Sequence, residues 1–221
     1  MCKLAFLCFS IVTMSGGAAF AQGLFLPNAT SGIGVAAGVS TNDDTTDFSL
    51  GLGYSYKTFI DGGVFVHRYG FDAPDMSAIG IQPYVNVHLL RQSDTIPLSL
   101  AAVGSFQKLF ITVPADAQPA SGWSFFVGGS AYRHFDLSNT MSITPQATLG
   151  FNFDHSTGTR GLIKRAADDS TIALQLNGNL GYRDGGGRIW TLNPYMAFDA
   201  DYVTFGALLG ATFPLKWGSG T

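Results

Sequence analysis

The four histidines are the residues of this sequence with the widest choice of chemistry. His67 lies in an apolar stretch, and Asp154 and His155 stand together at the end of another. A histidine that hydrogen-bonds an aspartate and a serine can activate the serine as a nucleophile, as a lipid- or peptide-modifying enzyme requires. A lone histidine near a strand end is more often a hydrogen-bonded structural residue. We therefore keep the enzyme as a rival hypothesis, and we predict structural roles for His88 and His134.

No other motif points to catalysis or to a cofactor. The sequence has no phosphate-binding glycine loop, no histidine and aspartate cluster with metal-ligand spacing, and no nucleophile elbow. Cys2 and Cys8 both lie in the N-terminal segment that we expect to be removed, so the remaining chain has no disulfide and no thiolate metal site. We predict no enzymatic activity, no cofactor and no metal ion.

A basic residue followed within four residues by an aspartate recurs along the chain, as in "LGYRDGGGR" at 180–188. Aspartate and glycine favour turns, and a basic side chain beside a tyrosine suits a membrane interface. We interpret the repeat as the periplasmic edge of a row of hairpins rather than as a catalytic site. Its residues are Lys57, Asp61, Arg91, Asp94, Arg133, Asp136, Arg183 and Asp184, with Lys216 as a final basic residue.

The elements that position these residues have the periodicity of β-strands. Large apolar residues alternate with small or polar ones in 47–57, and the alternation recurs in 142–154 and 171–183. Less regular versions occur at 31–40, 62–70, 79–91, 97–110, 122–134, 188–198 and 202–216. Most of these stretches approach the ~9 to 11 residues that a tilted strand needs to cross a bilayer. Ten strands result, with eight or twelve as alternatives.

The connections between the predicted strands alternate in length, which indicates a barrel with short periplasmic turns and longer outer loops. The longest, 155–170, is predicted to be a solvated loop with a short helical turn. Contact of its basic residues with lipopolysaccharide phosphates is the alternative. These basic residues are Arg160, Lys164 and Arg165. Five prolines in the predicted strands are interpreted as bulges or strand starts. They are Pro83, Pro97, Pro145, Pro194 and Pro214.

Residues 1–21 predict a cleaved secretory signal peptide. A basic start and a short apolar run, "LAFLCFSIV", precede small residues that end in Ala19-Phe20-Ala21, and a retained membrane anchor is the alternative. The rest divides into a short N-terminal periplasmic segment, 22–30, a barrel, 31–217, and a C-terminal tail, 218–221.

Composition favours a membrane barrel over a secreted soluble one. Charged residues make up 12% of the chain, and all 15 acidic residues are aspartates. The polar face of the predicted strands carries mostly Gly, Ser, Thr, Asn and Gln, whereas a soluble barrel would expose Lys, Glu and Arg there. We therefore predict lipid on the apolar face. The mildly acidic balance gives no indication of nucleic-acid binding.

The polar face then lines a lumen that we expect to be narrow or plugged. A barrel of roughly eight strands is just filled by side chains, whereas open porins have ~16 to 18 strands. A narrow channel or porin for small solutes is the main alternative. The predicted neutral lumen network consists of Gln82, Tyr84, Asn86, Gln146, Asn152, Gln175, Asn177, Asn179, Asn193 and Tyr195.

These features resemble the small outer-membrane β-barrel proteins of Gram-negative bacteria. The resemblance covers about 31–217, and "LLGATFPLKW" is similar to their C-terminal insertion signal, with Gly210, Phe213 and Leu215 at its key positions. The chain departs from that pattern by continuing through "KWGSGT". The resemblance implies an all-β, up-and-down transmembrane barrel in the outer membrane. It implies the insertion machinery, outer-membrane lipids and lipopolysaccharide as partners, and a structural or surface-interaction role carried by the outer loops. The oligomeric state is not predicted.

Overall fold

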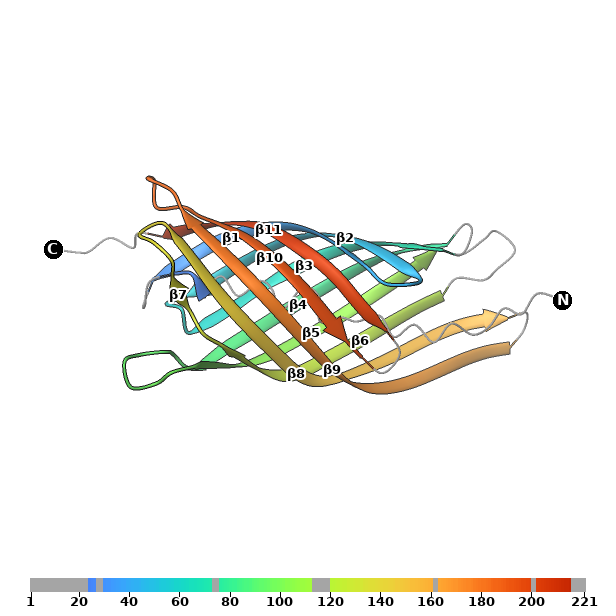
Figure 1. The fold of residues 1–221 in the computed structure, drawn as a ribbon. Coiled ribbons are helices and arrows are strands. Elements are labelled where there is room, and N and C mark those ends of the chain that lie inside the picture. Colours follow the sequence, from blue (N-terminus) through green and yellow to red (C-terminus); the bar gives the residue numbers. More distant parts are fainter. Residues whose placement is uncertain are drawn as a thin grey trace.

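The computed structural model describes residues 24–26, 30–72, 76–112, 120–160, 163–199 and 202–215. This part of the chain forms ten long strands and one short strand, β7 (Figure 1). They are β1 (Ser31–Thr41), β2 (Thr45–Tyr56), β3 (Ile60–Phe71), β4 (Ser77–Leu90), β5 (Ser99–Thr112), β6 (Ala120–Tyr132), β7 (Phe135–Asp136), β8 (Met141–Arg160), β9 (Ile163–Arg183), β10 (Ile189–Phe198) and β11 (Val203–Leu215).

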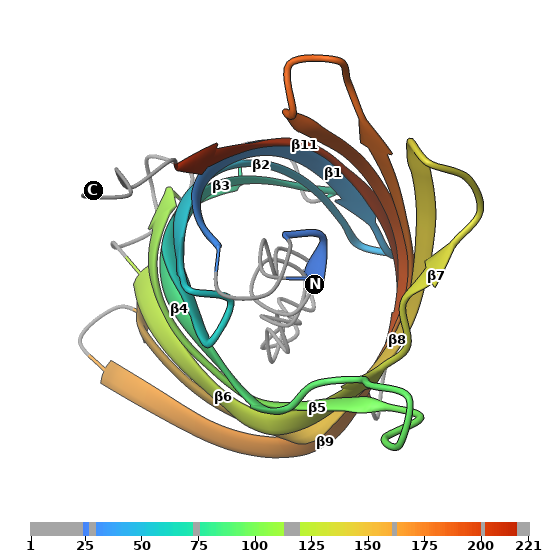
Figure 2. The ribbon, with the colours of Figure 1, turned by 90° about the vertical axis from the view of Figure 1, so that its left-hand side faces the viewer.

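The long strands form one closed antiparallel barrel (Figure 2). Each pairs with its neighbours in the chain, β6 pairs with β8 past the short β7, and β1 pairs with β11 to complete the ring. The predicted ten-stranded up-and-down barrel is confirmed, and the counts of eight and twelve are wrong. The alternation predicted it because successive side chains of a strand point to opposite faces. A strand that separates two different environments therefore alternates between two kinds of residue.

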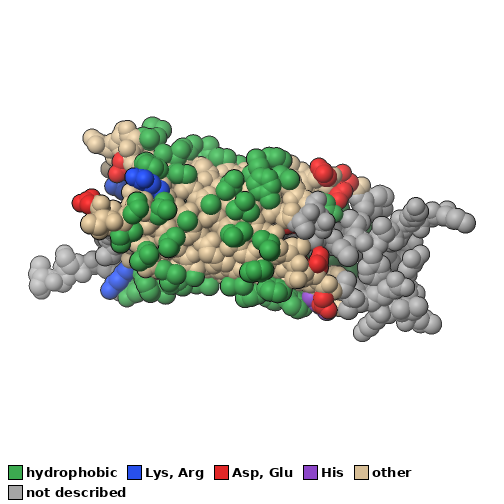
Figure 3. All heavy atoms as spheres, turned by 60° about the horizontal axis from the view of Figure 1, so that its bottom comes forward, with side chains coloured by type: hydrophobic (Ala, Val, Ile, Leu, Met, Phe, Trp, Pro, Cys, Tyr) green, Lys and Arg blue, Asp and Glu red, His purple; other side chains and the backbone are tan. Residues whose placement is uncertain are grey.

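The barrel has a polar inside and an apolar outside. In β2, the inward Asp47, Ser49 and Ser55 are buried, whereas the outward Phe48 and Leu50 are 60% and 67% exposed. Figure 3 shows apolar side chains spread over the side of the molecule. This is the reverse of a soluble barrel, in which large apolar side chains fill the interior.

Charged side chains lie at the two ends of the barrel. We call the end where β1 begins and β11 ends the termini end, and the opposite one the far end. In Figure 3, Lys and Arg side chains appear together with aspartates at the termini end, and aspartates appear at the far end. Outward aromatic residues lie near both ends, including Tyr56 and Trp190 at the termini end and Trp123 and Phe153 at the far end.

Strands β8 and β9 extend through the expected outer loop, so the prediction of a loop with a helical turn at 155–170 is wrong. The ladder between them reaches Arg160 and Ile163, whereas β6 leaves it at Thr157. Beyond the barrel these two strands pair only with each other, and their backbone hydrogen bonds need no apolar alternation. The predicted alternation of long and short connections is also wrong elsewhere: eight residues, 91–98, join β4 to β5 at the end where β1 begins, and three, 42–44, join β1 to β2 at the opposite end.

The interpretation of the strand prolines as bulges or strand starts is also wrong for Pro83, Pro145 and Pro194. Each lies inside its strand at a paired position, opposite Val64, Gly178 and Ala207 respectively. Pro83 and Pro194 each have a second neighbouring strand, β5 and β9 respectively. In that ladder the unpaired stretch has the same length in both strands, so the register is kept. The absent N–H of the proline therefore interrupts the pairing with one neighbouring strand only. The interpretation is wrong for Pro214 too, which pairs with Gly32 inside β11 without a bulge, whereas Pro97 lies just before β5.

Candidate functional site: a polar lumen with two histidine networks

All ten side chains of the predicted lumen network are buried. Their exposed fractions range from 0 to 7% for Gln82, Tyr84, Asn86, Gln146, Asn152, Gln175, Asn177, Asn179, Asn193 and Tyr195. Two of these bonds involve β9: Gln175 donates to Asn177 of the same strand at 2.7 Å, and Asn179 donates to Gln146 of the neighbouring β8 at 3.2 Å. Neutral amides can both donate and accept, so such bonds form in the lumen without a net charge.

The first histidine network lies towards the far end. His67 of β3 hydrogen-bonds Asp47 of β2 through Nδ1 and Gln82 of β4 through Nε2, each at 2.9 Å. The Gln82 amide then donates to the Ser105 hydroxyl of β5 at 3.2 Å. The His67 ring also stacks on Tyr69, with ring centroids 5.6 Å apart. Four consecutive strands are thus connected by side chains inside the barrel.

The second histidine network lies towards the termini end. His88 Nε2 and Asp61 Oδ2 are 2.7 Å apart, and His88 Nδ1 is 2.7 Å from the Tyr132 hydroxyl. The His88 and Asp61 side chains are completely buried. These contacts join β3, β4 and β6 inside the barrel, because Tyr132 reaches inward from the last position of β6.

The two rival catalytic histidines each have an aspartate partner. His155 Nδ1 is 2.6 Å from Asp168 Oδ1 at the far end, and its ring stacks on Trp123. Neither ring hydrogen-bonds a serine among the described residues; Nε2 of the buried His67 faces an amide. Neither arrangement supplies the activated hydroxyl that nucleophilic catalysis requires. Asp154, beside His155, accepts a hydrogen bond from Asn152.

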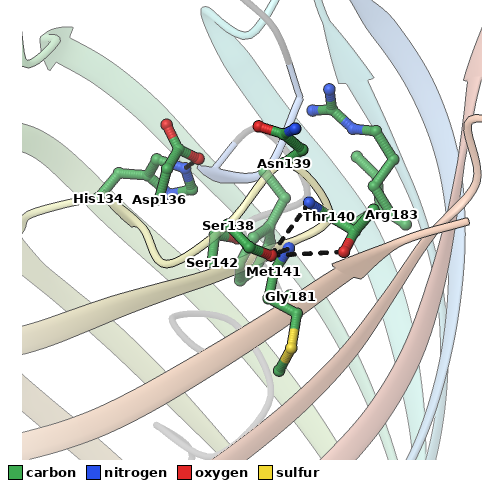
Figure 4. Close-up of a pocket in the computed structure, with 11 residues that line it drawn as sticks. His134, Asp136, Ser138, Asn139, Thr140, Met141, Ser142, Gly181 and Arg183 are labelled. Carbon is green, nitrogen blue, oxygen red and sulfur yellow. Dashed lines mark hydrogen bonds and ion pairs between the residues drawn. The ribbon is translucent and has the colours of Figure 1, made fainter.

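His134 lies at the rim of the termini end, in the wall of a small polar cavity (Figure 4). Its Nδ1 is 2.8 Å from the Thr144 hydroxyl, and its Nε2 is 3.2 Å from Asp136. The cavity also has Arg183 in its wall and a volume of about 50 Å³. Small-molecule pockets have about 300 to 1,000 Å³, so this one has room for water only.

The first hairpin corrects the prediction for Asp61. The turn between β2 and β3 is made by Lys57 and Thr58, whose φ angles are 48° and 55°, without aspartate or glycine. Because this turn is so short, Asp61 is the second residue of β3 and points into the lumen. Lys57 lies over the Tyr56 ring, 5.3 Å from its centroid.

The other basic residues of the predicted hairpin edge have separate contacts. Arg91 donates to the Thr58 carbonyl at 3.1 Å, and Arg133 lies over the Phe135 ring. Asp94 and Asp136 are exposed. Lys216 lies outside the described residues. These contacts lie at one rim, but they do not form one repeated structure.

Asp184 organises the turn between β9 and β10. Its carboxylate accepts hydrogen bonds from the backbone N–H groups of Gly186 and Arg188, and from the Arg188 and Trp190 side chains. Desolvation acts to raise the pKa of Asp184, but these hydrogen bonds outweigh it and hold the pKa below its ordinary value of 3.8. The ion pair in this turn is formed with Arg188, not with Arg183.

Replacing Asp184 with alanine is expected to lower stability at pH 7 and to have less effect in acid. A carboxylate with a lowered native pKa stabilises the fold above its ordinary pKa of 3.8, and this contribution is lost as the pH falls through the native value. Urea unfolding midpoints of the two proteins at pH 7 and pH 3 measure this effect. Asp94→Ala, at an exposed aspartate of another hairpin, is the matched control. An equal difference at both pH values would contradict the assignment.

The three residues of the predicted insertion signal lie in β11. Phe213 faces outward opposite Ile33, and Gly210 and Leu215 pair with Ala36 and Ser31 of β1. The signal therefore belongs to the strand that completes the barrel. Its recognition by an insertion machinery stays a prediction.

Within the described ranges, no group of three or more His, Cys, Asp or Glu side chains could hold a metal ion. In the same part of the chain, no helix is long and apolar enough to cross a membrane.

Comparison with known proteins identifies the fold. No protein-family model and no curated protein matches the sequence. Among solved structures, the translocator domain of the autotransporter NalP from Neisseria meningitidis is similar, with a TM-score of 0.55 and 11% identity over 84% of this chain and 88% of that one. The β domain of the Bordetella autotransporter BrkA has a TM-score of 0.52 and 14% identity over 84% of this chain and all of the other.

Ail, the attachment invasion locus protein of Yersinia pestis, superimposes more loosely, with a TM-score of 0.37 and 14% identity over 86% of this chain and all of Ail. The chain has the fold of bacterial outer-membrane β-barrel proteins, and the resemblance inferred from the sequence is confirmed at the level of this class.

Proposed function

We propose that this protein is an integral outer-membrane barrel with a structural or surface-interaction role and no enzymatic activity. The observation that carries the proposal is the apolar exterior of the barrel, with outward aromatic residues near both ends. Such an exterior is stable only against lipid, because large exposed side chains such as Leu50 and Leu209 would otherwise contact water. The longest hairpin, β8–β9, lies at the far end. Barrels of this kind have longer loops outside the cell than in the periplasm, so we infer that the termini end faces the periplasm and the far end faces outward.

The β8–β9 hairpin and the other far-end connections carry the specificity of this role. They lie beyond the part of the barrel that lipid covers, where binding residues are commonly found on a rigid scaffold. Arg160, Lys164 and Arg165 belong to this hairpin and supply cationic groups for lipopolysaccharide phosphates or for a protein partner. The partners in the membrane itself are outer-membrane lipids and, during assembly, the insertion machinery.

A narrow channel for small solutes is the second candidate. The polar lumen favours it, because the inward amides and hydroxyls resemble the lining of a water-filled passage. The buried contacts of His67 and His88 oppose it, because they fix large side chains of β2, β3, β4 and β6 inside the lumen. We therefore expect no single-channel steps from the intact protein in planar bilayers; ion-sized steps would favour the channel.

Cell fractionation and gel mobility test the main proposal. The protein is expected in the outer-membrane fraction, and unboiled samples are expected to migrate differently from boiled ones because the closed barrel resists detergent. A soluble protein in the periplasm or medium, with one mobility before and after boiling, would contradict the proposal. A known outer-membrane barrel and a periplasmic protein serve as markers on the same gel.

A further inference from the structure

Three consecutive apolar residues, Leu24, Phe25 and Leu26, are buried inside the termini end of the barrel. Their exposed fractions are 4%, 9% and 3%. They form one apolar cluster with Ala101 of β5, Tyr132 of β6 and Ile189 of β10. They belong to 22–30, which the sequence predicts to be a short N-terminal periplasmic segment. Their burial inside the barrel keeps three large apolar side chains in a row away from water.

The barrel wall leaves room for this segment at two glycines. A Cβ at Gly181 would lie 2.7 Å from the Phe25 ring, and a Cβ at Gly32 would lie 2.9 Å from a Leu26 methyl group. The Phe25 ring also meets the His134 ring edge to face, with centroids 6.3 Å apart. We call the surrounding wall residues, Gly32, Ala101, Tyr132, His134, Gly181 and Ile189, the socket.

The socket stands between the polar lumen and the termini end. Tyr132 belongs to both regions: its ring contacts the apolar cluster, and its hydroxyl bonds to His88 in the second histidine network. An apolar segment at this position excludes water from the inner polar groups, as hydrophobic constrictions do in channels that close by dewetting. Figure 2 looks into the barrel from this end.

We propose that the socket is a binding site for a short apolar peptide segment, and that the chain's own Leu24–Leu26 fills it and seals the lumen at the termini end. The same site would take a leucine- and phenylalanine-containing peptide in trans once the internal segment is withdrawn. This inference rests on the proposed membrane barrel but is independent of the role of the far-end loops.

A single cysteine at Ser55 reports whether the seal is in place. Ser55 lies opposite Gly32 in the ladder between β1 and β2, its side chain is fully buried, and its hydroxyl has no hydrogen-bond partner. Ser55→Cys therefore removes no hydrogen bond. The only cysteines of the sequence, Cys2 and Cys8, are replaced by serine in all proteins compared.

The measurement is the rate at which a charged, membrane-impermeant maleimide labels this cysteine in protein that shows the folded gel mobility. With Leu24, Phe25 and Leu26 all replaced by serine, labelling is expected to be at least about tenfold faster than in the parent, because the rate follows the open population. Added GLFLP peptide is expected to restore slow labelling, and GSSSP is not. Leu137→Ser, at an exposed leucine outside the socket, is expected to leave the rate unchanged.

Gly181→Val gives an independent test that leaves the segment intact. Its side chain would occupy the space of the Phe25 ring, so labelling is expected to accelerate as in the triple variant. Equal rates in the parent and in both variants would overturn the seal, and a GLFLP peptide without effect would overturn the binding site. Loss of the folded gel mobility in the parent would instead contradict the proposed membrane barrel, so the two failures are distinguishable.

Discussion

Asp61→Ala is expected to destabilise the barrel by about 1–3 kcal/mol, the range for leaving a buried hydrogen-bonding group without its partner. Asp61 and His88 are completely buried and 2.7 Å apart, so the variant leaves a polar ring nitrogen without this partner inside the barrel. Urea unfolding of the folded protein in detergent micelles or lipid vesicles, followed by the loss of the unboiled gel mobility, measures the change.

Three further variants separate this contact from a general effect of removing charge. Asp94→Ala removes an exposed aspartate and is expected to change stability by less than about 0.5 kcal/mol. Asp61→Asn keeps an oxygen acceptor, so it is expected to cost less than Asp61→Ala. Adding His88→Leu to Asp61→Ala is expected to regain part of the loss, because the ring that lacks its partner is then absent. Equal stability of Asp61→Ala and Asp94→Ala would show that the buried contact has no energetic importance.

Asp61 also shows where sequence reasoning was insufficient. The sequence "YKTFID" places the aspartate close to a basic residue, as in the other hairpins, and aspartate is common in turns. The turn is instead made by Lys57 and Thr58, two residues that rarely adopt a positive φ. Because the turn is this short, β3 begins earlier than expected and includes Asp61. The signal that could have found the contact is the alternation along each strand, which turns both Asp61 and His88 towards the lumen.

The strands themselves were predictable because their two faces meet chemically opposite surroundings. The alternation at 47–57, 142–154 and 171–183 corresponds to β2, the barrel part of β8 and the barrel part of β9. Where that contrast ends, the pattern ends too, and the outer halves of β8 and β9 could not be found from periodicity. The backbone pairing between them continues there without the alternation.

The contacts inside the barrel were predictable in kind but not in detail. Parity identified the inward Gln82 and Asn179, because every second residue of a strand faces the lumen. Which of them meet depends on the stagger between strands, and a single sequence does not contain it. The burial of Leu24–Leu26 was missed for a different reason: three apolar residues outside any strand have no periodicity to interpret.

Gly150→Ala is expected to destabilise the barrel by more than about 2 kcal/mol, or to prevent its assembly, because it overfills a close contact between strands. Gly150 of β8 pairs directly with Gly128 of β6. A Cβ at Gly150 would lie 2.4 Å from the Val127 carbonyl oxygen and 2.5 Å from the Phe126 ring. The yield of folded protein and its urea midpoint measure the effect. Gly104→Ala, whose nearest atoms are 3.8 Å away, is the matched control and is expected to be neutral.

A second pair of variants identifies the atoms responsible. At Gly51, the three nearest contacts of an added Cβ are all atoms of the Phe65 ring, the closest at 2.4 Å. Phe65→Leu is therefore expected to restore part of the stability lost in Gly51→Ala. Phe126→Leu is expected to give less relief to Gly150→Ala, because the Val127 carbonyl is part of the ladder and stays in place. Equal rescue at both sites would mean that the ring, rather than the close approach of β6 and β8, limits what position 150 accepts.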